Sequence, residues 1–152
     1  METDMQLSDH LPVENVAINL AFNSKTELLA KLAGLASRKI GIDKNIVLRA
    51  LTAREGLGST GIGQGVAIPH ATIEGLKQSL CLFLRLDMPV DFEAVDDVPV
   101  DIVVLLLSPP EERGQSLNVL SCIARSLRGD KMVTAVRSAD TADEIYALLI
   151  QG

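Results

Sequence analysis

A run of six consecutive aliphatic residues, Ile102 to Leu107, constrains the fold of this chain more than any other feature. A strand that is apolar at every position has no polar face to turn toward water, so it belongs in a sheet covered on both faces. A second apolar run of strand length extends from Leu80 to Leu86, and strand-like and helix-like segments alternate along the chain. We therefore expect an α/β fold with a single domain over residues 1–152: a three-layer α/β/α sandwich with a mixed central β-sheet flanked by helices.

Caps and apolar spacing place the remaining elements. Ser24 is expected to cap a helix that ends at Gly41, and Asp43 is expected to cap the helix after it. The expected elements are a helical turn at 6–11, strands at 16–20, 80–86 and 101–107, a helix between Ser24 and Gly41, and helices at 44–55, 114–128, 131–137 and 141–150. The inward face of the 114–128 helix is expected at Leu117, Leu120, Ile123, Ala124 and Leu127.

Charge and hydropathy exclude several classes of function. The net charge is −6 and Lys and Arg do not cluster, which argues against a nucleic-acid partner. The six-residue apolar run is too short to cross a bilayer, and the acidic segment Met1–Asp4 is unlike a secretory signal, so we expect a cytoplasmic protein without membrane insertion. Cys81 and Cys122 form no Cys-x-x-Cys pair, so we expect no metal site and no cofactor.

The segment from Arg54 to Ala71 carries five of the eleven glycines and one of the two histidines, His70. Glycines gather where backbone must approach a partner closely or adopt positive φ, and the amides of such a loop can point at an anion. The exit of the loop is expected to be extended, because Pro69 biases Ile68 away from helix. We expect a phosphate-handling site here, with loop contributions from Gly58, Ser59, Thr60, Gly61, Gly63, Gln64 and Gly65.

Two nucleotide-binding motifs match this loop as strings and fail in context. Gly56-x-Gly58-x-x-Gly61 follows a predicted helix instead of a strand, and no acidic residue stands at positions 75–86, where a ribose ligand is required. Gly58 and Gly63 have the spacing of a P-loop, but Gln64-Gly65 stands where that loop needs Lys and Ser or Thr. Neither motif supports a nucleotide site.

Four side chains of the segment are candidates for its chemistry: His70, Arg54, Ser59 and Thr60. His70 is either an inert histidine packed at a strand end or a nucleophilic imidazole that accepts and passes on a group. Arg54 continues the apolar stripe of its helix and so points toward whatever that stripe covers. Ser59 and Thr60 lack a second histidine to act as their base, so we assign them to hydrogen bonding within the loop, with phosphate contact as the alternative.

Two longer patterns span this region and the strand that follows it. The first is Arg54-Glu55, then Leu57-Gly58-Ser59-Thr60-Gly61-Ile62-Gly63, then Gly65-Val66-Ala67-Ile68-Pro69-His70. The second is Pro89-Val90-Asp91-Phe92, then Ala94-Val95-Asp96, then Pro99-Val100-Asp101-Ile102-Val103 through Leu107 to Pro109. Together they resemble the IIA components of the bacterial phosphotransferase system, in the mannitol, fructose and nitrogen-related subgroup. The likeness covers nearly the whole chain and is greatest to the nitrogen-related branch.

This resemblance implies a phosphocarrier. His70 would accept a phosphoryl group on Nε2 from a small phosphohistidine carrier, HPr or its nitrogen-branch paralogue, while a hydrogen bond fixes the other ring N–H. Arg54 would stabilise the phosphoryl oxygens as a planar fork, with help from the loop amides, and no metal would be needed. The downstream partner would be a regulatory target protein or, in the alternative, the IIB domain of a fructose- or mannitol-type permease.

Two positions depart from the pattern of the relatives. Many of them carry a second histidine near the start of the helix after the Pro-rich turn, where this chain has Ser116. Ser116 could offer at most a hydroxyl, and we expect it to act as a cap or as ordinary surface. Gln64 stands where sugar-specific relatives tend to carry Glu, which favours the regulatory branch.

Overall fold

Two long strands, β5 (Leu80–Val90) and β6 (Val100–Ser108), pair antiparallel at the centre of the sheet in this computed structural model. The structure describes residues 11–151. In that part of the chain the strand order is β1-β5-β6-β3-β2, with β4 also paired to β6. The outer strands are β1 (Val16–Leu20), β2 (Gly61–Gly63), β3 (Val66–Ala67) and β4 (His70–Thr72). Because β1, β3 and β4 pair parallel and β2 pairs antiparallel, the sheet is mixed, as predicted.

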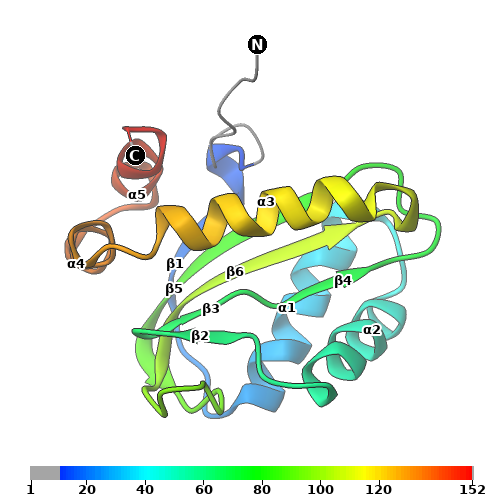
Figure 1. Ribbon diagram of the computed structural model, residues 1–152, viewed down its shortest axis with the longest axis horizontal. Helices are drawn as coiled ribbons and strands as arrows, with labels where there is room; N and C mark the ends of the chain where they lie inside the picture. Colours follow the sequence, from blue (N-terminus) through cyan, green and yellow to red (C-terminus); the bar gives the residue numbers. More distant parts are fainter. Residues whose placement is uncertain (1–10, 152) are drawn as a thin grey trace.

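Helices cover both faces of this sheet (Figure 1). The first face is covered by α1 (Lys25–Ile40) and α2 (Lys44–Gly56). The second face is covered by α3 (Arg113–Ser126), α4 (Asp130–Ser138) and α5 (Ala142–Gln151). Short 3₁₀ turns, Val13–Asn15 and Pro110–Glu112, precede β1 and α3. The predicted three-layer α/β/α sandwich is confirmed.

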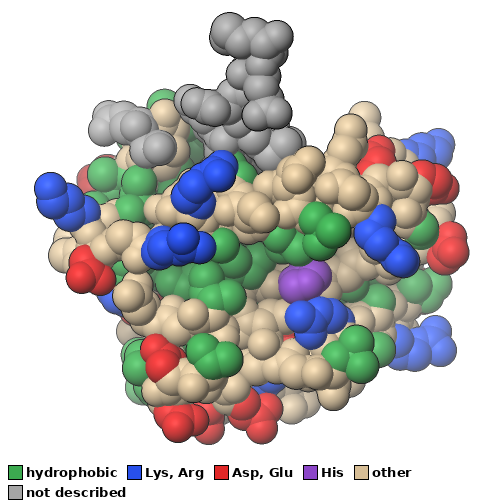
Figure 2. Space-filling view, in the orientation of Figure 1, with side chains coloured by type: hydrophobic (Ala, Val, Ile, Leu, Met, Phe, Trp, Pro, Cys, Tyr) green, Lys and Arg blue, Asp and Glu red, His purple; other side chains and the backbone are tan. Residues whose placement is uncertain are grey.

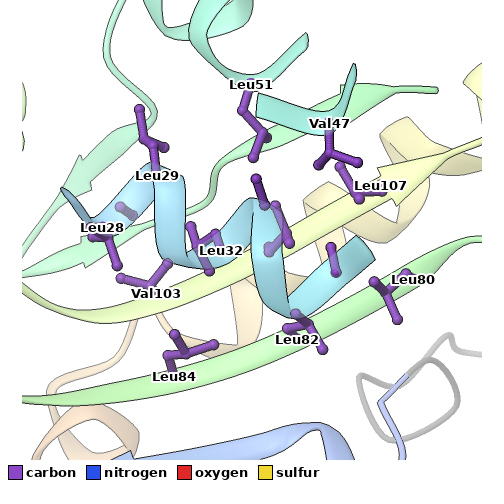
Figure 3. Packing of buried hydrophobic residues seen from close by; sticks show 14 of the residues in the cluster. Leu28, Leu29, Leu32, Val47, Leu51, Leu80, Leu82, Leu84, Val103 and Leu107 are labelled. Carbon is purple, nitrogen blue, oxygen red and sulfur yellow. The ribbon is translucent and has the colours of Figure 1, made fainter. Parts of the chain in front are cut away.

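The continuous apolar runs divide between the two layers by strand alternation. Leu82 and Leu84 pack with α1 and α2, whereas Cys81 and Phe83, which alternate with them along β5, pack with the opposite helices. Figure 3 shows the first of these cores, in which Leu32 and other α1 side chains lie over the strands. Successive side chains of a strand point to opposite faces, so a strand covered twice must be apolar throughout.

Both cysteines are buried in the core. Cys81 and Cys122 are each 2% exposed; Cys81 lies in the core that faces α3 to α5, and Cys122 is a buried residue of α3. Burial raises the pKa of the Cys81 thiol to about 12, and the neighbouring Cys122 raises it as well. Cys81 therefore stays protonated at neutral pH and packs as a small apolar side chain.

The caps agree with the predictions. The Ser24 hydroxyl accepts from Glu27 N at 3.1 Å, and the Asp43 carboxylate accepts from Asn45 N at 2.7 Å. Gly41 follows α1 with φ of 72°, the left-handed conformation that closes a helix. The predicted turn at 6–11 lies almost wholly outside the described residues.

Two predictions about the elements are corrected. β5 is longer than the apolar run and continues through the exposed residues Asp87 to Pro89. Leu117 does not face the core: it is 61% exposed, and the buried positions of α3 are Ser116, Val119, Cys122 and Ile123. The buried face of α3 is thus rotated by about one residue from the predicted one.

Candidate functional site

His70 begins β4, immediately after Pro69, and lies beside Leu106 of the central strand β6. Its ring is oriented by the main chain, because Nδ1 lies 2.8 Å from the Ile68 carbonyl oxygen. A carbonyl only accepts hydrogen bonds, so Nδ1 carries the proton and Nε2 keeps its lone pair. Nε2 in turn accepts from Arg54 Nε at 3.3 Å. The half-buried His70 is thereby a neutral imidazole with one defined nucleophilic nitrogen.

Arg54 reaches His70 from the last turn of α2, as the helical spacing predicted. Its Nη1 donates to the Gly58 carbonyl oxygen at 2.9 Å, just beyond the end of the helix. This bond ties Arg54 to the chain just after the helix, and a cation at a helix C-terminus is electrostatically favourable. The side chain is therefore held by its own helix end while Nε faces the imidazole.

His70 and Arg54 line a cleft of about 640 Å³ between α2, β4 and the start of α3. Figure 2 shows the histidine side chain at the bottom of a hollow, with a basic side chain beside it and hydrophobic ones around it. The apolar border includes Leu57, 85% exposed, and Leu117, 61% exposed. Among the described residues that line this cleft, none is Asp or Glu. The cleft is therefore apolar and basic on an acidic protein.

The glycine segment is anchored by a carboxylate whose role the sequence analysis did not identify. Glu55, with a side chain only 5% exposed, accepts from the Thr60 backbone N at 3.1 Å and also from the Thr60 hydroxyl. Lys25 Nζ lies 3.0 Å from the same carboxylate. Ser59 Oγ donates to the Phe92 carbonyl oxygen and accepts from Gly61 N. The hydroxyls of Ser59 and Thr60 therefore take part in hydrogen bonds that hold the segment, and one of the partners, Phe92, lies outside it.

We expected the loop amides to point at an anion beside His70. Three of these amides have hydrogen-bond partners within the protein instead. The amides of Thr60, Gly61 and Gln64 donate to the side chains of Glu55, Ser59 and Asp96 respectively. Gly58 contacts Arg54 through its carbonyl oxygen, which accepts a hydrogen bond from Arg54 Nη1. None of the residues from Gly58 to Gly65 is among those that line the cleft.

The glycines instead allow close packing and positive φ. An added Cβ at Gly61 would lie 2.7 Å from the Ala94 Cβ, and one at Gly65 would lie 2.3 Å from Arg137 Nη2. Gly58, Gly63 and Gly65 have φ of 150°, 105° and 82°, values that side chains disfavour. The segment therefore shapes the turn between β2 and β3, with His70 following it on β4.

Gln64 lies at this turn, away from the cleft. Its backbone N donates to Asp96 Oδ2 at 2.9 Å, and its carbonyl oxygen accepts from Arg137 Nη2 at 2.7 Å. Hydrogen bonds from the Gln64 and Val98 amides lower the pKa of Asp96 below its usual value. Gln64 is thus bound to α4 through Arg137, and the structure does not bring its side chain into the cleft with His70.

Ser116 lines the cleft with His70 but its hydroxyl already has a partner. Oγ donates to the Glu112 carbonyl oxygen, one turn earlier, at 2.9 Å. The side chain is 8% exposed. Its hydroxyl closes the first turn of α3, as expected for a local cap-like bond.

Ser116→Ala is accordingly expected to leave the rate of phosphoryl transfer to His70 within a few-fold of wild type, since the lost bond belongs to the helix backbone. Ser116→His, which places a second imidazole in the cleft, tests the opposite case and is expected to change the pH profile near neutrality. Phosphorylation assays quenched at a series of times measure the rates of both variants, and repeating them across pH gives the pH profile. A Ser116→Ala variant slowed a hundredfold would contradict this assignment.

Three residues of the cleft were missed by sequence reasoning. Leu57 and Leu117 are indistinguishable in sequence from core leucines. Arg113 had a weak signal: it is a cation in the first turn of a helix, where the dipole disfavours positive charge.

Within residues 11–151, no group of three or more His, Cys, Asp or Glu is placed to hold a metal ion. In the same range, no helix has the length and apolar character needed to cross a membrane.

Comparison with known proteins finds relatives that match most of this chain. The nitrogen regulatory protein of Bradyrhizobium diazoefficiens is 39% identical over 145 residues, covering 95% of each chain. The crystal structure of nitrogen regulatory protein IIA-Ntr from Neisseria meningitidis matches with a TM-score of 0.89 and 35% identity, over 94% of this chain and 98% of that one. The fructose-specific EIIA component of Haloferax volcanii is 30% identical, over 72% of this chain and 71% of its own.

The family-level match extends over nearly the whole sequence. Residues 9–152 match the family described as phosphoenolpyruvate-dependent sugar phosphotransferase system, EIIA 2. The resemblance noted in the sequence is therefore confirmed at the level of the family. This chain belongs to the EIIA 2 family of the phosphoenolpyruvate-dependent phosphotransferase system.

Proposed function

We propose that this protein is a phosphocarrier that accepts a phosphoryl group on His70 Nε2 from an HPr-like phosphohistidine protein. The observation that carries the proposal is the bond between Nδ1 and the Ile68 carbonyl oxygen. It fixes the tautomer in which Nε2 is unprotonated and directed into the cleft beside Arg54. A nucleophilic imidazole needs this protonation state before a donor arrives.

The transfer step follows from that tautomer. The Nε2 lone pair forms a bond to phosphorus while the nitrogen–phosphorus bond of the donor histidine breaks, and its electron pair returns to the donor ring. The Nδ1 proton stays in place, so the product ring is cationic and keeps its hydrogen bond to Ile68. Arg54, already 3.3 Å from Nε2, is placed to donate to the phosphoryl oxygens as they approach.

We further propose that the phosphorylation state of His70 regulates binding to a target protein. Relatives named nitrogen regulatory proteins are 32–39% identical over 88–99% of this chain. A 2-O-alpha-mannosyl-D-glycerate-specific EIIABC component is 33% identical over 88% of the chain, and the fructose-specific relative is 30% identical over 72% of it. Phosphorylation adds nearly two negative charges. A target that docks on the basic cleft through its carboxylates would be repelled, so such binding should favour unphosphorylated His70.

The alternative is a transport component that hands the phosphoryl group to a permease IIB domain. The discriminating assay is discharge: the protein is phosphorylated with phosphoenolpyruvate, the first enzyme of the system and its carrier, and then mixed with fructose- and mannitol-type IIB domains. The regulatory proposal expects the label to remain on His70. Rapid and complete discharge to either IIB domain would replace it with the transport function.

A further inference from the structure

The cleft around His70 contains a second arginine that faces the same space as Arg54. Arg54 and Arg113 come from opposite walls, the last turn of α2 and the first residue of α3. In the described part of the chain, His70 and these two arginines are the ionisable side chains that line the cleft. On a chain with a net charge of −6, a cleft with two arginines and no carboxylate is suited to an anion.

The two guanidinium groups differ in how they are held. Arg54 is bound to Gly58 and His70. Arg113 is exposed, and none of the ion pairs and side-chain hydrogen bonds found within residues 11–150 holds it. The carboxylate next to it, Glu112, accepts from the Ser79 hydroxyl at 3.4 Å instead.

Folding alone gives Arg113 no evident role. A cation in the first turn of a helix is opposed by the helix dipole, which carries a cost in stability. No internal bond offsets that cost for Arg113 among the described contacts. A bound anion would offset it, because it would interact favourably with the guanidinium and with the positive end of α3.

Arg54 by itself cannot serve every stage of the transfer. In the unphosphorylated protein its Nε donates to the Nε2 lone pair, the same lone pair that must attack phosphorus. Arg54 must therefore give up this bond as the phosphoryl group arrives. Ser116, which also lines the cleft, has its hydroxyl bound to the Glu112 carbonyl oxygen. The phosphoryl group carries nearly two negative charges. Besides Arg54, the cation that lines the cleft around it is Arg113.

We propose that Arg113 is a second phosphate-binding residue, which closes on the phosphoryl group of phosphorylated His70 from the wall opposite Arg54. This inference rests on the proposed function, that His70 is the acceptor. Arg113 would act on the phosphorylated state and leave the unphosphorylated fold unchanged.

Phosphoramidate provides the test, because it phosphorylates imidazoles without a protein donor: its nitrogen–phosphorus bond breaks and ammonia leaves. Wild type, Arg113→Gln, Arg113→Lys and Arg125→Gln are compared with phosphoramidate and with the phosphorylated carrier. Arg125 is a matched control, an exposed arginine in the last turn of the same helix that does not line the cleft. The measurements are the phosphorylation rate, the hydrolysis rate of phosphorylated His70 and the thermal midpoint.

Arg113→Gln is expected to slow phosphorylation by both donors about five- to tenfold, the range for one charge-assisted hydrogen bond at a partly exposed site. Arg113→Lys should recover part of the rate, Arg125→Gln should match wild type, and all thermal midpoints should agree. Normal phosphoramidate kinetics in Arg113→Gln would overturn the inference, and a defect with the protein carrier alone would place Arg113 in docking instead. Failure of wild type to be labelled at His70 by either donor would overturn the proposed function itself.

Discussion

His70→Ala is expected to take up no phosphoryl group from the phosphorylated carrier, the largest effect of any single substitution. His70 is the residue whose free nitrogen faces the cleft, and the other histidine of the chain, His10, follows an aspartate near the N-terminus. Incubation with phosphoenolpyruvate, the first enzyme of the system and its carrier, followed by mass spectrometry of the acid-labile phosphate, measures the result.

A matched pair of controls separates chemistry from folding in this experiment. In His70→Asn the side-chain amide can replace Nδ1 as the donor to the Ile68 carbonyl oxygen, while the nucleophilic Nε2 is removed. This variant should keep the wild-type thermal midpoint and also remain unlabelled. His10→Ala should be labelled normally. Full labelling of His70→Ala would show that the acceptor is another residue.

The layers of the fold were predictable because their signals are local. The apolar runs at 80–86 and 101–107 need no knowledge of the neighbours, since a strand that is apolar at every position must be covered on both faces. Ser24, Asp43 and Gly41 mark helix ends through bonds within a few residues. These features depend on contacts close in sequence, and the structure confirms them.

The face of α3 was not predictable in the same way. Its sequence carries apolar residues on two adjacent faces, and Leu117 belongs to the face that borders the cleft. Helical periodicity identifies apolar stripes but cannot tell a stripe that packs on the sheet from one left at a binding surface. The buried position beside it is Ser116, a polar residue whose hydroxyl is satisfied by its own helix.

The loop shows the same limit at the level of hydrogen bonds. A dense set of glycines correctly predicted positive φ, which Gly58, Gly63 and Gly65 adopt. Where the amides point depends on Glu55 and on Asp96, and the latter reaches the loop from a distant part of the sequence. From the sequence alone, a glycine loop whose amides donate to carboxylates of the same protein cannot be told from one whose amides bind phosphate, because the long-range partner is not known.

Arg54→Ala is expected to slow phosphorylation of His70 by about two orders of magnitude or more. Removing one preorganised donor from a developing anion costs about 2.7–4 kcal/mol in comparable sites, and each 1.36 kcal/mol is about tenfold in rate. Arg54→Lys should recover a part of the loss, because an ammonium supplies charge but cannot donate to His70 and Gly58 in the fork geometry of a guanidinium.

Arg54→Ala should change the thermal stability of the protein very little. Besides His70, Arg54 donates to the Gly58 carbonyl oxygen, which loses its donor in Arg54→Ala. Because Gly58 is exposed, water can replace that hydrogen bond. Arg49→Ala is the matched control: it removes the same charge from an exposed position earlier on α2, where Nε donates to the Asn45 carbonyl oxygen. Rapid-quench kinetics and thermal melts of the three variants decide the case. Near-normal transfer in Arg54→Ala would mean that Arg54 only orients the resting imidazole, and that charge from elsewhere in the cleft or from the donor stabilises the transition state.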